Sequence, residues 1–348
     1  MAEILLRELS NADIDWMTSV GTQTQIPQGT TILKPYERPD AFHILLDGEL
    51  SLMGTGQDGQ PSKKIATLVS GDAFGESTLF NAPLPIEVRA EQDVRLFSIT
   101  QSQLSSKLAQ DTTFSGHFYR AIALILSDRL RKIYAAPDQL RFSSNQAVKE
   151  AMFVFGELRD SDVDWLMAVG QIQQYSAPDD FLVQAGRPVE ALYIVLSGQF
   201  SVFVFDGDHN PNPFAVCFEC PYETANTMNL VTNISKGEMA GTIAFLDFSP
   251  HLFSIKTSED AMVLRVPRPQ LAAKLLQDMS FSSRFHRIVC LQLLDLLQTS
   301  MGHLGLVNID TNIDEGILGD EIDMDSLQQV SKGAARFNWM LKQLGTIS

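Results

Sequence analysis

Cys217 and Cys220 have the C-x-x-C spacing that is found in metal and redox sites. A structural zinc ion needs four ligands, and the only histidine close to this pair in the sequence is His209. Two thiols in a β-like run are the simpler interpretation. The alternatives are metal or redox chemistry, including a metal shared between subunits. The surrounding segment, residues 206–234, is rich in Asn and Pro and carries aromatic residues. It either binds a partner or folds back on its own domain.

No other residues have the spacing of a catalytic site. The sequence has no phosphate-loop motif, no G-x-S-x-G, no H-E-x-x-H and no kinase signature, so we expect a protein that is not an enzyme. A formal net charge of −16 disfavours phosphate backbones and anionic membranes. There is no run of about 18 apolar residues and no signal peptide, and cysteine is sparse. We expect a cytoplasmic protein that neither binds nucleic acid nor inserts into a membrane.

The elements that would position a site occur twice. Residues 104–120 read LSSKLAQDTTFSGHFYR and residues 271–287 read LAAKLLQDMSFSSRFHR, so nine residues recur at an offset of 167 without a gap. Nearer the N-terminus, residues 9–21 (LSNADIDWMTSVG) match residues 158–170 (LRDSDVDWLMAVG) at an offset of 149. Matches of this length indicate two copies of one domain.

Each copy is expected to contain a short helix, several short strands with glycine turns, and a long helix. The runs FHILLDGEL (42–50) and LYIVLSGQF (192–200) are apolar and β-rich and contain an Asp-Gly or a Ser-Gly step, which predicts a hairpin in each copy. Apolar residues at spacings of three and four predict one long helix over 101–134 and another over 268–301.

This order of elements resembles the cyclic nucleotide-binding domain family, in which a β-roll is preceded by a helix and followed by a hinge helix. The resemblance covers nearly all of residues 1–300, in tandem. It is carried by SGDAFGESTLFNAPLPIEVRAEQDVRLFSI (70–99) and KGEMAGTIAFLDFSPHLFSIKTSEDAMVLRV (236–266). It implies a mainly β fold with flanking helices (α+β): two tandem cyclic-nucleotide-binding-domain-like β-rolls, plus a C-terminal helix.

We expect five parts: a first domain, a linker, a second domain, an acidic linker and a C-terminal amphipathic helix, over residues 1–134, 135–150, 151–301, 302–325 and 326–348. In the last helix Leu327, Phe337 and Leu341 share one apolar stripe, and Trp339 and Met340 lie off it. The second domain is the expected cover for this stripe. A second subunit or a separate protein is the alternative.

The family resemblance implies a ligand site with three parts. A carboxylate accepts a hydrogen bond from the ribose, an arginine pairs with the cyclic phosphate, and a hydroxyl completes the phosphate site. In the first copy Gly75 and Glu76 match the start of this site, but Leu84 stands at the arginine position and Glu87 at the hydroxyl position. A carboxylate repels phosphate, so we expect no cyclic nucleotide in the first copy.

The second copy departs from the family pattern at other positions. Its candidate ligand residues are Gly237, Gly241, Thr242, His251 and Ser254. Thr242 replaces the ribose carboxylate, His251 replaces the arginine, and Ser254 keeps the hydroxyl. Histidine is a cationic partner for phosphate only when its pKa rises above neutrality. We therefore expect at most weak binding of an anion here.

The leading interpretation is a regulatory or scaffold protein that needs no cofactor and acts through protein–protein contacts, as a homodimer, with a protein partner, or both. The candidate contact residues are Phe118, Phe285, Leu327, Phe337, Trp339 and Leu341. The alternative is a sensor that binds a cyclic nucleotide or a related anionic small molecule, mainly in the second domain. A transcription regulator is disfavoured because no basic helix-turn-helix follows either long helix.

Overall fold

The computed structural model describes residues 2–54, 63–80, 84–135, 140, 153–176, 180–205, 228–304 and 324–346. The chain divides into two compact units. Unit 1 contains residues 1–126 and 290–312, and unit 2 contains residues 127–289 and 313–348. The boundaries between these units fall inside two long helices, α4 (Thr112–Tyr134) and α9 (Met279–His303). The predicted linkers and the C-x-x-C pair lie largely outside the described residues.

Unit 1 opens with α1 (Ala2–Glu8) and α2 (Asn11–Val20), and its strands form two antiparallel sheets. The sheet orders are β1-β8-β3-β6 and β2-β7-β4-β5. The strands are β1 (Thr22–Ile26), β2 (Thr31–Leu33), β3 (Ala41–Asp47), β4 (Glu49–Gly54), β5 (Lys63–Val69), β6 (Ala73–Phe74), β7 (Ile86–Ala90) and β8 (Val94–Thr100). Their buried side chains, among them Phe42, Leu50 and Val88, form the core of the unit.

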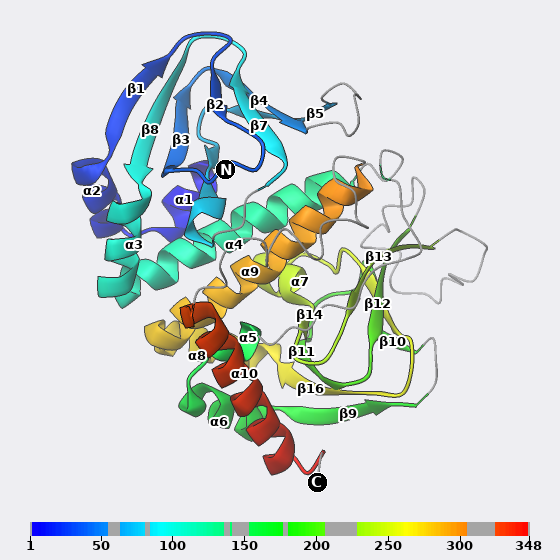
Figure 1. The fold of residues 1–348 in the computed structure, drawn as a ribbon. Helices are drawn as coiled ribbons and strands as arrows, with labels where there is room; N and C mark the ends of the chain where they lie inside the picture. Colours follow the sequence, from blue (N-terminus) through cyan, green and yellow to red (C-terminus); the bar gives the residue numbers. More distant parts are fainter. Residues whose placement is uncertain are drawn as a thin grey trace. The chain divides into compact units, whose positions relative to one another are not determined.

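Unit 2 repeats this plan after α5 (Phe153–Glu157) and α6 (Asp160–Val169). Its sheet orders are β14-β11-β16-β9 and β10-β15-β12-β13, which match those of unit 1 strand for strand. The strands are β9 (Gln171–Tyr175), β10 (Phe181–Val183), β11 (Ala191–Ser197), β12 (Phe200–Phe205), β13 (Met228–Ile234), β14 (Met239–Ala240), β15 (Ser254–Thr257) and β16 (Ala261–Pro267). The predicted duplication and fold class are confirmed (Figure 1).

The two predicted hairpins are wrong. Strands β3 and β4 follow each other directly in the chain but belong to different sheets, and so do β11 and β12. Between β3 and β4, Gly48 has a φ of +96°, and a Cβ at this position would lie 2.9 Å from the carbonyl oxygen of Asp93. Glycine tolerates both the left-handed backbone and the close approach. The glycine step therefore carries the chain across from one sheet to the other.

Each predicted long helix consists of two helices. In the first copy α3 (Gln101–Gln110) precedes α4, and in the second copy α8 (Arg268–Gln277) precedes α9. The breaks fall at Asp111 and Asp278. Asp111 Oδ1 accepts hydrogen bonds from the backbone N of Thr113 (3.1 Å) and of Phe114 (3.0 Å), and Asp278 Oδ1 accepts one from the backbone N of Phe281 (2.9 Å). In each copy the backbone hydrogen bonds of the first helix stop at this aspartate, and its side chain caps the next helix.

The C-terminal helix α10 (Met324–Gln343) packs against α5 and α6 within unit 2 (Figure 1). The ring centroids of Phe337 and Phe155 are 4.7 Å apart, and Leu341 is buried. The prediction that Met340 lies off the apolar stripe is wrong, because its side chain is fully buried. Trp339 remains 38% exposed. No helix in the described part of the chain is long and apolar enough to cross a membrane.

Candidate functional site

The two copies build the same turn before the candidate site. In unit 2 the backbone N of Gly237 donates to Val195 O (2.9 Å), and the Glu238 carboxylate accepts from the backbone N of Ser235 (2.6 Å). Unit 1 has the same two contacts at equivalent positions, including one from the backbone N of Val69 to Asp72 Oδ2 (3.0 Å). Gly237 and the acidic residue after it therefore shape the turn.

A left-handed glycine starts the short helix in each copy. Gly75 has a φ of +84° and Gly241 a φ of +87°. Gly75 precedes the four-residue 3-10 helix η1 (Glu76–Leu79), whereas Gly241 precedes the six-residue α-helix α7 (Thr242–Asp247). A Cβ on Gly75 would lie 2.5 Å from Ala41 O, so this position requires glycine. The scaffold is shared, but the helix is shorter in the first copy.

The backbone at the family's arginine position is also the same in both copies. Leu84 O accepts a hydrogen bond from the backbone N of Tyr36, and His251 O accepts one from the backbone N of Gly186, each at 2.9 Å. Leu84 is buried and apolar. The structure thus places a leucine and a histidine at equivalent points of two matching loops.

In the first copy the polar side chains near this position make local contacts. Glu76 is buried at the start of η1, and Thr78 Oγ1 donates to Pro39 O at 2.5 Å. Glu87 Oε1 accepts a hydrogen bond from Thr31 Oγ1 at 3.1 Å, whereas Arg89 is exposed two residues further along β7. The Glu87 carboxylate therefore remains where the family has a hydroxyl.

His43 is a site residue that the sequence analysis missed. A Cβ on Gly75 would lie 3.4 Å from His43 Cδ2, so this ring borders the start of η1. The ring stacks on Phe74 with centroids 4.8 Å apart, and Nδ1 lies 2.8 Å from Ser98 Oγ. Burial lowers the pKa of His43 below its usual value, which favours the neutral form. The sequence gives one signal for His43, which is a polar residue within an otherwise apolar run.

In the second copy His251 lies beside the start of α7, because a Cβ on Gly241 would be 3.5 Å from His251 Cε1. The side chain is 8% exposed. Burial, together with the nearby Arg131 guanidinium, lowers the pKa of His251 to about 4, so the imidazole is uncharged at neutral pH. Ser254 Oγ accepts a hydrogen bond from the backbone N of Ala185 (3.0 Å), and Thr242 is buried.

Arg131 places a guanidinium near His251, and it comes from the part of α4 that belongs to unit 2. Its Nε donates to Asp247 Oδ2 (2.5 Å), and its Nη2 donates to Asp247 Oδ1 (3.0 Å) and to Pro250 O (3.2 Å). Asp247 ends α7, and Pro250 directly precedes His251. The guanidinium is therefore paired with a carboxylate at the end of α7.

The candidate contact residues fall into three groups. Phe118 and Phe285 are buried in the cores against other aromatic rings. Phe337 and Leu341 pack within unit 2, and Trp339 is partly exposed. The side chain of Leu327 lies outside the described residues, as do Cys217 and Cys220. Elsewhere, in the described part of the chain, no group of three or more His, Cys, Asp or Glu side chains could hold a metal ion.

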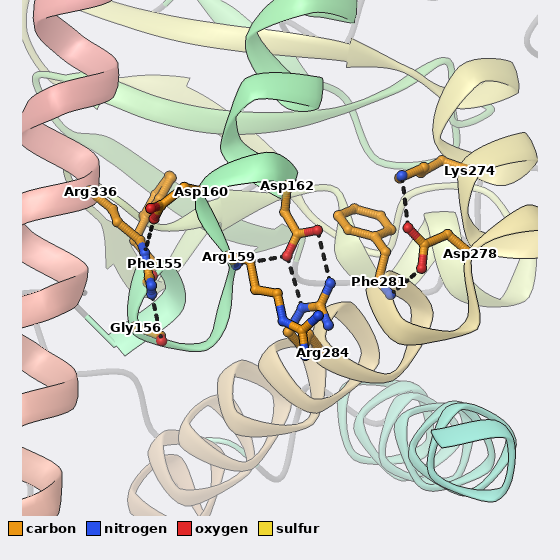
Figure 2. A network of polar contacts seen from close by, with 10 residues as sticks. All are labelled: Phe155, Gly156, Arg159, Asp160, Asp162, Lys274, Asp278, Phe281, Arg284 and Arg336. Atoms are coloured by element: carbon orange, nitrogen blue, oxygen red, sulfur yellow. Dashed lines mark hydrogen bonds and ion pairs between the residues drawn. The ribbon is translucent and has the colours of Figure 1, made fainter. Parts of the chain in front are cut away.

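Figure 2 shows the polar network around α6 in unit 2. Asp162 accepts two hydrogen bonds from Arg284, at 2.8 and 2.9 Å, and one from the backbone N of Arg159 at 2.7 Å. In unit 1 the equivalent carboxylate, Asp13, lies 2.8 Å from His117 Nδ1. Burial raises the pKa of Asp13, but hydrogen bonds from Ser10 and His117 outweigh it, and the pKa lies below its usual value.

Comparison with known proteins supports one family. The cyclic nucleotide-binding domain matches residues 23–111 and 173–278, together more than half of the chain. No curated protein matches the sequence. Among solved structures, the regulatory domain of Toxoplasma gondii PKA with cAMP has 14% identity, a TM-score of 0.29, and coverage of 78% of this chain and 87% of its own. Thermus thermophilus catabolite activator protein has 20% identity, a TM-score of 0.33, and coverage of 48% and 70%.

Proposed function

Because the chain belongs to the cyclic nucleotide-binding domain family and carries two such domains in tandem, we propose that it is a regulatory or scaffold protein without enzymatic activity. In this proposal it acts through protein–protein contacts, as a homodimer or with a separate partner. Neither copy holds a cyclic nucleotide through the contacts that the family resemblance implies. Both copies retain the turns and the short helix as scaffold.

One observation carries this proposal: neither arginine position offers a positive charge. Leu84 is buried and apolar, and the pKa of His251 is lowered to about 4, so His251 is uncharged at neutral pH. A cyclic phosphate carries a negative charge, and arginine binds such a group with a fork of donors that neither leucine nor neutral imidazole supplies. The nearby guanidinium of Arg131 is already bound to Asp247.

Calorimetric titration with cyclic AMP and cyclic GMP tests the proposal directly. We expect no binding to the full chain, and we expect the double variant Thr242→Glu, His251→Arg to gain affinity because it restores both family side chains. The single variant Leu84→Arg is the matched control in the first copy, because Glu76 already supplies the carboxylate there and Glu87 still repels phosphate. Micromolar binding by the unmodified chain that His251→Ala abolishes would contradict the proposal. Analytical ultracentrifugation then separates a homodimer from a monomer that needs a partner.

A second candidate function is a ligand sensor in the second copy. The side chains of Thr242, His251 and Ser254 are all uncharged at neutral pH, which favours a neutral ligand over an anion. Thermal-shift measurements with adenosine and with cyclic AMP distinguish these cases. Stabilisation by adenosine alone, lost in His251→Ala, would favour the sensor, and no shift with either compound would favour the scaffold.

A further inference from the structure

In unit 2 the outer face of α5 is covered by α10. Phe155 is 0% exposed, and the ring of Phe337 lies against it. Arg336 Nη1 donates to the carbonyl oxygens of Phe155 (3.4 Å) and Gly156 (3.2 Å), and its Nε donates to Asp160 Oδ1 (2.7 Å) (Figure 2). An aromatic residue and an arginine at adjacent positions thus fasten an amphipathic helix across the end of α5.

The same face exists in unit 1. At the offset of 149, Phe155 corresponds to Leu6, and Asp160 corresponds to Asn11. Leu6 is 64% exposed, although Leu5 on the same helix and Leu9 just after the helix are buried. The inner side of α1 is therefore docked, while its outer side presents a large apolar residue to solvent.

The two helices are anchored in the same way, so the comparison is between equivalent surfaces. Glu8 pairs with Arg120 (3.1 Å) in unit 1, and Glu157 pairs with Arg287 in unit 2. The last carbonyl groups of a helix have no partner within the helix, and in unit 2 Arg336 provides one. A helix that packs against α1 would meet the last carbonyl groups of α1 beside the apolar side chain of Leu6.

We propose that the face of α1 and α2 around Leu6 binds an amphipathic helix of a partner protein, with a basic and aromatic chemistry like that of α10. The charges fit this occupant. Residues 331–346 contain three basic residues and no acidic residue, whereas the whole chain has a net charge of −16. Glu3 is exposed three positions before Leu6, on the same side of α1. This inference rests on the proposed function, since it names the surface through which protein contacts are made.

A labelled synthetic peptide of residues 324–346 is a suitable probe, because it reproduces the helix that covers the equivalent face. We expect saturable binding to the full chain by fluorescence anisotropy, weaker at high salt. Leu6→Asp should weaken binding at least about tenfold, because it buries a charge beside the peptide's apolar stripe. Leu276→Asp is the matched control, since Leu276 is 71% exposed on α8, and binding should be unchanged.

Three outcomes would overturn the inference. The peptide fails to bind, or it binds Leu6→Asp as well as it binds the unmodified chain, which would indicate exchange with α10 in unit 2. In the third, ultracentrifugation shows a dimer that Leu6→Asp converts to a monomer, and the occupant is then a second copy of this chain. Leu6 belongs to neither candidate ligand site, so the nucleotide titrations test the proposed function separately from this surface.

Discussion

The two copies share their sheet orders and one loop hydrogen bond, but their side-chain chemistry differs. Tyr36 and Gly186 donate the same hydrogen bond to Leu84 and His251, yet one loop presents an apolar side chain and the other a neutral imidazole. Matching sheet orders make the difference easy to locate, because every strand has a counterpart. The sheets and turns are alike in the two copies, whereas the residues differ at the positions that the family resemblance assigns to a ligand.

The helical ends of the two copies differ in the same manner. Asp162 is held by a bidentate arginine, Arg284, and its counterpart Asp13 is held by His117. Phe155 is covered by α10, and its counterpart Leu6 is exposed. In unit 2 the outer face of α5 is therefore covered by another helix, and the aspartate of α6 has the stronger ion pair. Four measurements test this contrast.

The largest effect is expected for Phe155→Ala. Removing a fully buried ring that packs against Phe337 should destabilise unit 2 by about 3–5 kcal/mol, whereas Leu6→Ala should change stability by less than about 0.5 kcal/mol. Urea unfolding followed by tryptophan fluorescence measures both, since Trp16 lies in unit 1 and Trp165 in unit 2. Equal losses in the two variants would show that the two faces are covered alike.

Asp162→Asn should have the next largest effect. It leaves the guanidinium of Arg284, which is mostly buried, without its carboxylate, and we expect a loss of about 3 kcal/mol. Asp13→Asn removes a contact with one imidazole nitrogen and should cost about 1–2 kcal/mol. Calorimetric unfolding of both variants gives the comparison. A larger loss for Asp13→Asn would mean that the histidine tie is the stronger one.

A pH dependence should follow from His251. Its pKa is lowered from 6.5 to about 4 in the folded protein, so the unfolded chain takes up a proton first as the pH falls. The stability is complete above pH 6.5 and should drop by about 2 kcal/mol by pH 5. His251→Gln should flatten this slope, and His43, whose pKa is also lowered, should account for part of what remains. An unchanged slope in His251→Gln would rule out this assignment.

The smallest effect concerns backbone strain. Tyr36 has a φ of +59°, and the equivalent Gly186 has a φ of +80°. The backbone of a residue other than glycine rarely adopts this left-handed region. Tyr36→Gly should stabilise unit 1 slightly, by about 0.5 kcal/mol, because relief of strain exceeds the added chain entropy. Gly186→Ala should destabilise unit 2 by about 1 kcal/mol. If Tyr36→Gly lowers the melting temperature, the packing of the half-exposed tyrosine ring stabilises unit 1 by more than the strained backbone destabilises it.

The duplication, the family and the order of the elements can be predicted from the sequence alone. Ungapped matches place Leu84 and His251 at equivalent positions, and the structure confirms the equivalence through one backbone hydrogen bond in each copy. Local patterns are sufficient for this, because helix periodicity, turn glycines and offsets depend on neighbouring residues. The same local reasoning gave a hairpin at Gly48, since an Asp-Gly step does not reveal which sheet the next strand joins.

The charge of His251, the partner of Asp247 and the helix that covers Phe155 follow only from the folded structure. Arg131 is 116 positions from Asp247, and Phe337 is distant in sequence from Phe155, so no local pattern connects them. The neutral state of His251 follows from burial and from a guanidinium on another helix. Burial and ion pairing depend on segments that meet only in the folded chain, which is why one copy has a covered helix face and the other an exposed one.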